Sequence, residues 1–265
     1  MIANVLSIAG TDPTGGAGIH ADLKTFSALG AYGMAVTTAV VAQNTCGVRG
    51  FVVLDPAFVG EQIDAVFEDV RVDAVKIGMV ANAALAEVIA GRLQRHARCP
   101  IVLDPVMVAK SGDRLLLPDA VAAIRERLVP LATVITPNLP EAALLLGRTA
   151  AQTIDEMQAT LAALQELGAD WVLLKGGHLP GPQSIDLLQG AGHSERLDAG
   201  RIATRSLHGS GCTLAAAVAA LLPGNEVPAA VRQAKAYLTA ALAAADQLAV
   251  GRGQGPLHHF HALWR

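Results

Sequence analysis

Short apolar segments rich in β-branched residues alternate with longer amphipathic segments along most of the chain. The short segments have the length of buried strands, and the longer ones have the period of helices that pack on one face. Strands are predicted at residues 4–10, 34–44, 72–80, 100–107, 132–138 and 170–177, and helices at residues 18–30, 56–69, 82–96, 118–130, 139–147 and 153–168. This alternation is typical of βαβ units. It predicts an α/β fold in three αβα layers, with a central, mostly parallel sheet flanked by helices on both faces.

The pattern changes near residue 184, where the stretch 184–202 has shorter strand-like segments and more turn residues. We interpret it as an antiparallel edge of the sheet that precedes the last helices. The chain has no internal repeat and no low-complexity linker, so we expect residues 1–265 to form a single domain.

Composition excludes several classes of function. The formal net charge is −3, which favours neither nucleic acid nor an anionic membrane as a partner. The first ten residues lack the basic region of a signal peptide, and the apolar runs fall short of the roughly 18 residues of a spanning helix. Cys46, Cys99 and Cys212 have no CxxC spacing, which argues against a disulfide framework or a zinc site. We therefore expect a cytoplasmic protein.

Polar and glycine residues gather where the predicted strands end, in the segments AGTDPTGGAG, AQNT, IGM, DPVM, TPN and KGGH. Ligands of open α/β sheets bind outside the carboxyl ends of the strands. The sequence therefore predicts that these segments share one active-site rim.

The stretch Gly209-Ser210-Gly211-Cys212 opens an apolar, alanine-rich helix. No P-loop motif and no GxGxxG motif occurs, so this stretch is the candidate anion hole, formed by amides at a helix N-terminus. A tight turn before a packed helix is the structural alternative. Cys212 would lie in the first helical turn, where the dipole lowers a thiol pKa, although inert cysteines also occur in such helices.

Lys175 follows a predicted strand and precedes two glycines, a position from which it could neutralise a transferring phosphoryl group. A solvated lysine at a strand end is the alternative. Asn138 and Glu141 lie three residues apart at a helix start, which places both on one face. Glu141 could hold Mg²⁺ through water, or it could simply cap the helix.

Several segments occur together and in order: AGTDPTGGAG, ADLKTFSALGAYG, VAQNT, VKIGM, TPNLPEA, KGGH, HGSGC and the tail GPLHHFHALW. In this combination the chain resembles, over practically its whole length, the hydroxymethylpyrimidine and phosphomethylpyrimidine kinases of thiamin biosynthesis. The resemblance implies a ribokinase-like fold, with ATP and Mg²⁺ as co-substrates and a homodimer as the assembly. Ser210 stands where that family commonly has threonine, a change that keeps the hydroxyl group.

The resemblance also implies roles for individual residues. Gln43 would read an aminopyrimidine ring, because an amide can donate to a ring nitrogen and accept from the neighbouring amine. The pyrimidine pocket would be lined by Gly10, Met79 and Val106, and phosphate and magnesium would be bound by Asn138, Glu141 and Lys175. The anion hole would be formed by Gly209, Ser210, Gly211 and Cys212.

The implied substrate, 4-amino-5-hydroxymethyl-2-methylpyrimidine, is phosphorylated twice. Its alcohol must lose a proton in the first step, and Cys212 is the candidate base. The nucleophile of the second step is a phosphate that is already ionised. A pyridoxal kinase and a non-catalytic pyrimidine-binding protein are the competing interpretations.

Other residues have simpler interpretations. We expect Cys46 and Cys99 to be filler or strand-start residues, and the tail histidines His258, His259 and His261 to serve packing or the surface. The charged loop 110–114 could cover a nucleotide or form a solvated turn.

Overall fold

The computed structural model describes residues 1–107, 116 and 119–264. A sheet of eight strands lies at its centre, in the order β10-β9-β8-β7-β6-β5-β1-β2. The strands are β1 (Asn4–Ala9), β2 (Tyr32–Thr37), β5 (Ala74–Ile77), β6 (Ile101–Leu103), β7 (Val134–Ile135), β8 (Trp171–Lys175), β9 (Gln183–Gly190) and β10 (His193–Gly200). All neighbours from β2 to β8 are parallel, whereas β8–β9 and β9–β10 are antiparallel. The mostly parallel sheet and its antiparallel edge are both confirmed.

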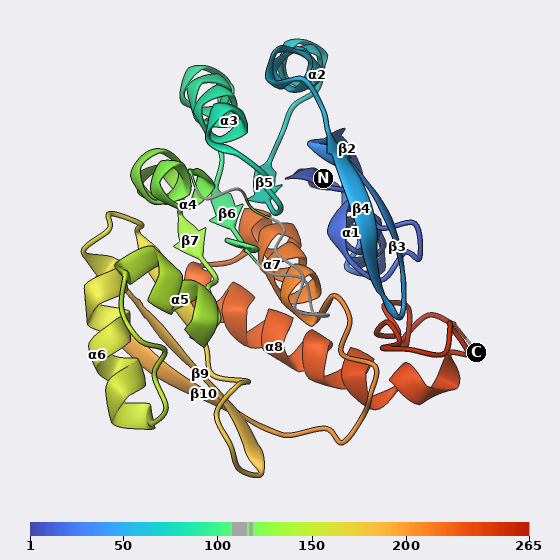
Figure 1. The fold of residues 1–265 in the computed structure, drawn as a ribbon, viewed down its shortest axis with the longest axis vertical. Helices are drawn as coiled ribbons and strands as arrows, with labels where there is room; N and C mark the ends of the chain where they lie inside the picture. The colour runs from blue at the N-terminus through green and yellow to red at the C-terminus, as the bar shows by residue number, and fades with distance from the viewer. Residues whose placement is uncertain (108–115, 117–118, 265) are drawn as a thin grey trace.

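Helices cover both faces of this sheet. They are α1 (Gly18–Ala28), α2 (Pro56–Asp69), α3 (Ala83–His96), α4 (Ala120–Ala123), α5 (Leu139–Leu146), α6 (Ile154–Gln165), α7 (Ser210–Leu221) and α8 (Val227–Ala243). One apolar core joins α2 to α6 with the sheet, and a second core joins α1, α7 and α8 with its other face. In Figure 1 the helices α3, α4 and α6 lie toward the top and left of the view, whereas the orange helices α7 and α8 lie nearer its centre. The predicted αβα layers are confirmed.

Helix starts coincide with capping side chains in the sequence. Asp55, Asn82 and Thr153 each accept hydrogen bonds from first-turn amides of α2, α3 and α6. Such caps satisfy amide groups that would otherwise lack a partner, which is why these boundaries follow the sequence closely.

The expected strand at residues 34–44 is divided in two. The chain turns at Thr38, whose Oγ1 donates to the carbonyl oxygen of Met79 at 2.8 Å. Beyond it, β3 (Ala39–Asn44) leaves the main sheet and pairs antiparallel with β4 (Gly47–Val53). The segment between the predicted strand and the predicted helix at 56–69 is therefore a tight turn followed by a strand. The division at Thr38 was concealed because threonine suits strands and periodicity alone does not say which sheet a residue joins.

The expected helix at residues 118–130 is less regular than its pattern indicates. Within the described part, α4 continues as a π-helical segment (Ile124–Leu128) and a 3₁₀ segment (Val129–Leu131). The remaining 3₁₀ segments are Leu222–Gly224 and Ala245–Gln247. The charged loop 110–114 lies outside the described residues. A search of the described chain finds no helix with the length and apolarity needed to cross a membrane.

Candidate active site

A cavity of about 690 Å³ opens at the carboxyl ends of the parallel strands. Every residue proposed from the sequence for the site lines it: Gly10, Gln43, Met79, Val106, Asn138, Glu141, Lys175, Gly209, Ser210, Gly211 and Cys212. The strand ends of β1, β5, β6, β7 and β8 contribute most of the rim, and β3 contributes Gln43. The segments grouped from the sequence therefore border one cavity, and their part in an active site stays a prediction.

The glycine turn before α7 is open to this cavity. Gly209 has φ of +79°, a left-handed conformation that favours glycine, and a Cβ atom there would overlap with the carbonyl oxygen of Gly16. No side chain of the described residues caps α7. The first-turn amides of α7 therefore border the cavity at the positive end of the helix dipole, an arrangement suited to an anion.

Lys175 ends strand β8 beside this turn. Its Nζ lies 2.8 Å from Oδ1 of Asp104 and 3.9 Å from Oε2 of Glu141. A Cβ atom on Gly211 would lie 3.2 Å from the same nitrogen. Burial lowers the pKa of Lys175, but Asp104 and Glu141 outweigh burial and raise it. A permanent positive charge thus lies next to the anion-binding turn, and the solvated-lysine alternative does not describe it.

Asn138 and Glu141 form a capping box at the start of α5. The backbone N–H of Glu141 donates to Oδ1 of Asn138 at 2.9 Å, and the backbone N–H of Asn138 donates to Oε2 of Glu141 at 2.7 Å. The capping interpretation of Glu141 is therefore correct, and it coexists with a place on the cavity wall. Burial raises the pKa of Glu141 to about 7, with Lys175 opposing this shift and Asp104 adding to it.

Asp104 is a carboxylate that the sequence analysis did not single out. It follows β6 directly, and Oδ1 accepts hydrogen bonds from Lys175 Nζ at 2.8 Å and from Thr136 Oγ1 at 3.1 Å. Its Oδ2 is buried without a hydrogen-bond partner among the described residues. A buried, unpaired carboxylate oxygen in a cavity is suited to a hard cation.

Cys212 corrects one expectation. The helix dipole was expected to lower its pKa, whereas burial raises the pKa of this thiol to about 11, and the nearby cation of Lys76 only partly opposes that effect. Desolvation of the thiolate outweighs the helix start, although Cys212 is only partly buried and lies on the cavity wall. The thiol is therefore protonated at neutral pH in this structure.

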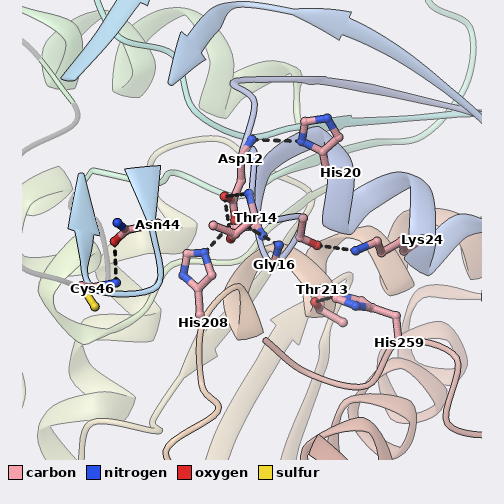
Figure 2. Close-up of polar contacts among 12 residues, drawn as sticks. Asp12, Thr14, Gly16, His20, Lys24, Asn44, Cys46, His208, Thr213 and His259 are labelled. Carbon is pink, nitrogen blue, oxygen red and sulfur yellow. Dashed lines mark hydrogen bonds and ion pairs between the residues drawn. The ribbon is translucent and has the colours of Figure 1, made fainter. Parts of the chain in front are cut away.

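The same cavity is lined by the residues proposed for ring recognition. A Cβ atom on Gly10 would lie 3.1 Å from Sδ of Met79, so these two residues form a narrow wall. Gln43 interacts with the buried carboxylate of Asp12 and lowers its pKa, and the same carboxylate binds His208. Figure 2 shows His208 pointing at Asp12 from the segment that leads into α7.

This arrangement agrees with a match to a known family. The sequence model described as phosphomethylpyrimidine kinase matches residues 12–258. The chain belongs to the phosphomethylpyrimidine kinase family. Its recognition from sequence motifs is thereby confirmed.

Curated relatives in this family are similar over practically the whole of this chain. A hydroxymethylpyrimidine/phosphomethylpyrimidine kinase of Salmonella typhimurium is 56% identical over 98% of both chains. A protein of the same name from Rhizobium meliloti is 54% identical over 100% of both. The Thiamine biosynthesis bifunctional protein ThiED of Geobacter sulfurreducens is 46% identical over 98% of this chain and 52% of its own.

Solved structures share the fold. A phosphomethylpyrimidine kinase from Clostridium difficile has a TM-score of 0.79 at 42% identity, covering 89% of this chain and 98% of its own. A pyridoxal kinase from Bacillus subtilis, described as an ADP complex, has a TM-score of 0.90 at 36% identity, covering 99% of both chains. The ribokinase-like architecture expected from the sequence is confirmed.

Four ionisable residues that line the cavity were missed by sequence reasoning. Asp104 carried a readable signal, since it directly follows a buried strand. Asp12 and His208 stand beside glycines in the segments TDPTGG and HGSGC, but they are 196 residues apart. Lys76 lies within the strand VKI and is fully buried, with Nζ 2.8 Å from Oδ2 of Asp22. No spacing rule connects such pairs.

The remaining expectations concern single residues. His258 and His259 are buried in the C-terminal tail, and His259 Nε2 lies 3.1 Å from Oγ1 of Thr213, so their packing role is confirmed. Cys46 is exposed and Cys99 is partly buried two residues before β6, in agreement with the filler and strand-start interpretations.

Proposed function

We propose that the protein transfers phosphoryl groups from ATP to 4-amino-5-hydroxymethyl-2-methylpyrimidine, first forming the monophosphate and then the diphosphate, in the biosynthesis of thiamin. One observation carries the proposal: a ring-reading amide, a buried lysine and an open helix start line a single cavity. Family membership supports the same activity.

In the first step the hydroxymethyl oxygen attacks the γ-phosphorus. A new oxygen–phosphorus bond forms, and the bond to the ADP oxygen breaks. Lys175 and the amides of residues 209–212 stabilise the charge on the phosphoryl oxygens. Cys212 is the proposed acceptor of the alcohol proton. With a pKa of about 11, its thiolate is scarce at neutral pH but strongly basic.

In the second step the phosphate of the monophosphate attacks a second ATP. Its oxygen carries no proton that must be removed, so positioning and charge neutralisation suffice. One site can therefore serve both acceptors, with Gly10, Gln43, Met79 and Val106 holding the ring in each case.

We assign Mg²⁺ to the carboxylate side of the cavity. Glu141 and the unpaired Oδ2 of Asp104 supply the oxygen donors that this ion prefers, and Asn138 supports Glu141 as its capping partner. Two carboxylates suffice, because Mg²⁺ in nucleotide sites usually completes its shell with water and phosphate oxygens. When bound, the ion neutralises phosphate charge.

The test is production of both phosphates by the purified protein. With ATP and Mg²⁺, the hydroxymethyl pyrimidine is expected to yield its monophosphate and then its diphosphate, which anion-exchange chromatography separates. One ADP should form for each phosphoryl group transferred. Absence of acceptor-dependent ADP would leave a binding protein as the correct interpretation.

Pyridoxal is the second candidate acceptor. The fold agrees closely with pyridoxal kinases, including a Staphylococcus aureus enzyme in complex with AMP-PCP and pyridoxal at a TM-score of 0.91 and 31% identity. A higher kcat/KM for pyridoxal than for the pyrimidine would favour it. We further propose a cytoplasmic homodimer in which residues 1–265 form one domain.

A further inference from the structure

Asp12 collects hydrogen bonds from the loop before α1 and from His208, which lies just before α7. Its Oδ1 accepts from the amide and the hydroxyl of Thr14, at 2.9 Å and 2.8 Å. Its Oδ2 accepts from the amides of Gly16 and Ala17, at 3.0 Å and 2.8 Å, and from Nε2 of His208 at 2.7 Å. Figure 2 shows this cluster at the loop before α1. The side chain of Asp12 is only 1% exposed.

The carboxylate of Asp12 remains ionised although it is buried. Burial alone would raise the pKa of Asp12, but the hydrogen bonds from His208, Gln43 and Thr14 outweigh it and hold the pKa far below its usual value. An ionised carboxylate accepts hydrogen bonds and donates none. Any amide that bonds to it must therefore present its nitrogen.

Gln43 is such an amide. Its side chain interacts with the Asp12 carboxylate and lowers the pKa of that group, and both residues line the cavity. With one N–H directed to Asp12, the amide keeps a second N–H and its Oε1 for a ligand. Without this partner the two ends of the amide could exchange places at little cost, since they have nearly the same shape.

The hydrogen bond between His208 and Asp12 also connects Asp12 to the anion-binding turn. His208 precedes Gly209, and its own amide donates to the carbonyl oxygen of Gly255 at 3.1 Å. The imidazole packs on Gly16, where a Cβ atom would collide with the ring. Asp12 thus joins the α1 loop, the ring-reading strand β3 and the start of α7 through one carboxylate.

We propose that Asp12 is a specificity-determining positioning residue, which His208 holds in place and which fixes the Gln43 amide with its nitrogen toward Asp12 and its oxygen available to the ligand. The inference rests on the proposed function, because it concerns how that site selects its acceptor. The fixed amide selects rings that present a ring nitrogen as acceptor beside an amine as donor.

The chemistry of the ring edge makes this selection strong. In the 4-amino pyrimidine, N3 accepts and the amine donates, which complements the fixed amide. In the analogue with oxygen in place of the amine, N3 carries a proton and the oxygen accepts, so the pattern is reversed. A site that leaves polar groups unpaired with the wrong ligand rejects it by a large factor.

The experiment measures binding of these two ligands by calorimetry, without nucleotide. The quantity of interest is the ratio of Kd for the 4-oxo analogue to Kd for the 4-amino compound. We expect Asp12→Asn to lower this ratio at least about tenfold, because an amide at this position can both donate and accept and so permits Gln43 to rotate. A merely structural role would weaken both ligands alike and leave the ratio unchanged, which would overturn the proposal.

Two further sets of variants keep the test decisive. In a Gln43→Ala background, where the ring-reading amide is missing, Asp12→Asn is expected to change the ratio less than twofold; a full effect there would overturn the proposal. If Asp12→Asn does not fold, His208→Leu is the alternative variant. It removes the 2.7 Å hydrogen bond from His208 to Asp12 but retains those from the loop amides, and the ratio of the two Kd values is expected to fall at least threefold. His208→Gln can place an amide nitrogen where Nε2 lies, and should restore the ratio to within twofold.

Failure of the proposed function would look different. A wild-type protein that binds neither pyrimidine, or that binds without phosphorylating, contradicts the kinase assignment. A wild-type protein that phosphorylates the 4-amino compound, with Asp12→Asn and His208→Leu ratios that equal the wild-type ratio, contradicts only the role of Asp12.

Discussion

Nζ of Lys175 lies 2.8 Å from Oδ1 of Asp104; Lys175 ends β8 and Asp104 directly follows β6, the two strands on either side of β7. The pair bridges the carboxyl ends of three strands next to the start of α7. Only one oxygen of Asp104 is used in this contact and in the hydrogen bond from Thr136, so the other oxygen stays available inside the cavity. The pair therefore combines a cation for phosphate with a carboxylate for a metal ion.

Replacing Lys175 tests the cationic half of this pair. We expect Lys175→Ala to lower kcat/KM of both phosphorylations by a similar factor, on the order of 10² to 10³, since both transfers build charge on the same phosphoryl oxygens. Steady-state rates with each acceptor measure this. Arg127→Ala, which removes an exposed ion pair with Glu87, is the control and should change both rates less than about twofold. A loss confined to one acceptor would argue against the role.

Cys212 distinguishes the two steps, because only the first acceptor has a hydroxyl proton to lose. We expect Cys212→Ala to slow the first phosphorylation by a factor on the order of 10² and the second much less. Since burial raises the pKa of Cys212 to about 11, the rate of the first step in the wild type should increase with pH between 7 and 9. The second step should lack this increase.

Cys99 provides the matched control for that variant. Burial raises its pKa to about 11 as well, but it lies outside the cavity, so Cys99→Ala should leave both steps within about twofold of wild type. Equal losses in the two steps of Cys212→Ala would remove the base assignment. A thiol alkylation rate that levels off below pH 8 in a Cys46→Ser/Cys99→Ser background would contradict the raised pKa.

Gly209 tests the turn itself. A methyl group at this position meets the carbonyl oxygen of Gly16, and the left-handed backbone opposes any L side chain. We expect Gly209→Ala to destabilise the protein by about 1–3 kcal/mol and to lower both transfer rates. Urea unfolding and steady-state kinetics measure the two effects. Gly91→Ala, in α3 with open space around it, should stabilise by about 0.5–1 kcal/mol; the same loss at both glycines would contradict a special role for Gly209.

The sequence was sufficient for the layers and for part of the cavity lining. Buried parallel strands are continuous apolar runs, and their polar ends converge at one edge, which is why Lys175, Asn138 and Gln43 could be grouped correctly. The division at Thr38 was concealed, because β2 and β3 read as one strand-like segment although they join different sheets.

The chemistry of individual groups was less accessible. The first-turn position of Cys212 is visible in the sequence, but the depth of its thiol is not, so the expected direction of the pKa shift was wrong. The contact between Asp12 and His208 joins residues 196 apart along the chain. Such a pair depends on how the C-terminal helices return to the first loop, which no local pattern records.

The C-terminal tail makes stability depend on pH through His259. Burial, followed by the charge of Lys24, lowers the pKa of His259 from 6.5 to about 4, and Thr213 Oγ1 lies 3.1 Å from its Nε2. Between these values the unfolded chain binds a proton that the folded protein excludes, so stability falls as the pH drops from about 6.5 toward 4. This group contributes up to about 3 kcal/mol to that loss.

Urea unfolding at several pH values should show a shallower acid-side slope for His259→Gln than for wild type. His261→Gln, in the same tail, is the control for removing a histidine. Equal slopes for wild type and His259→Gln would mean that the folded protein accepts a proton at His259 as readily as the unfolded chain does.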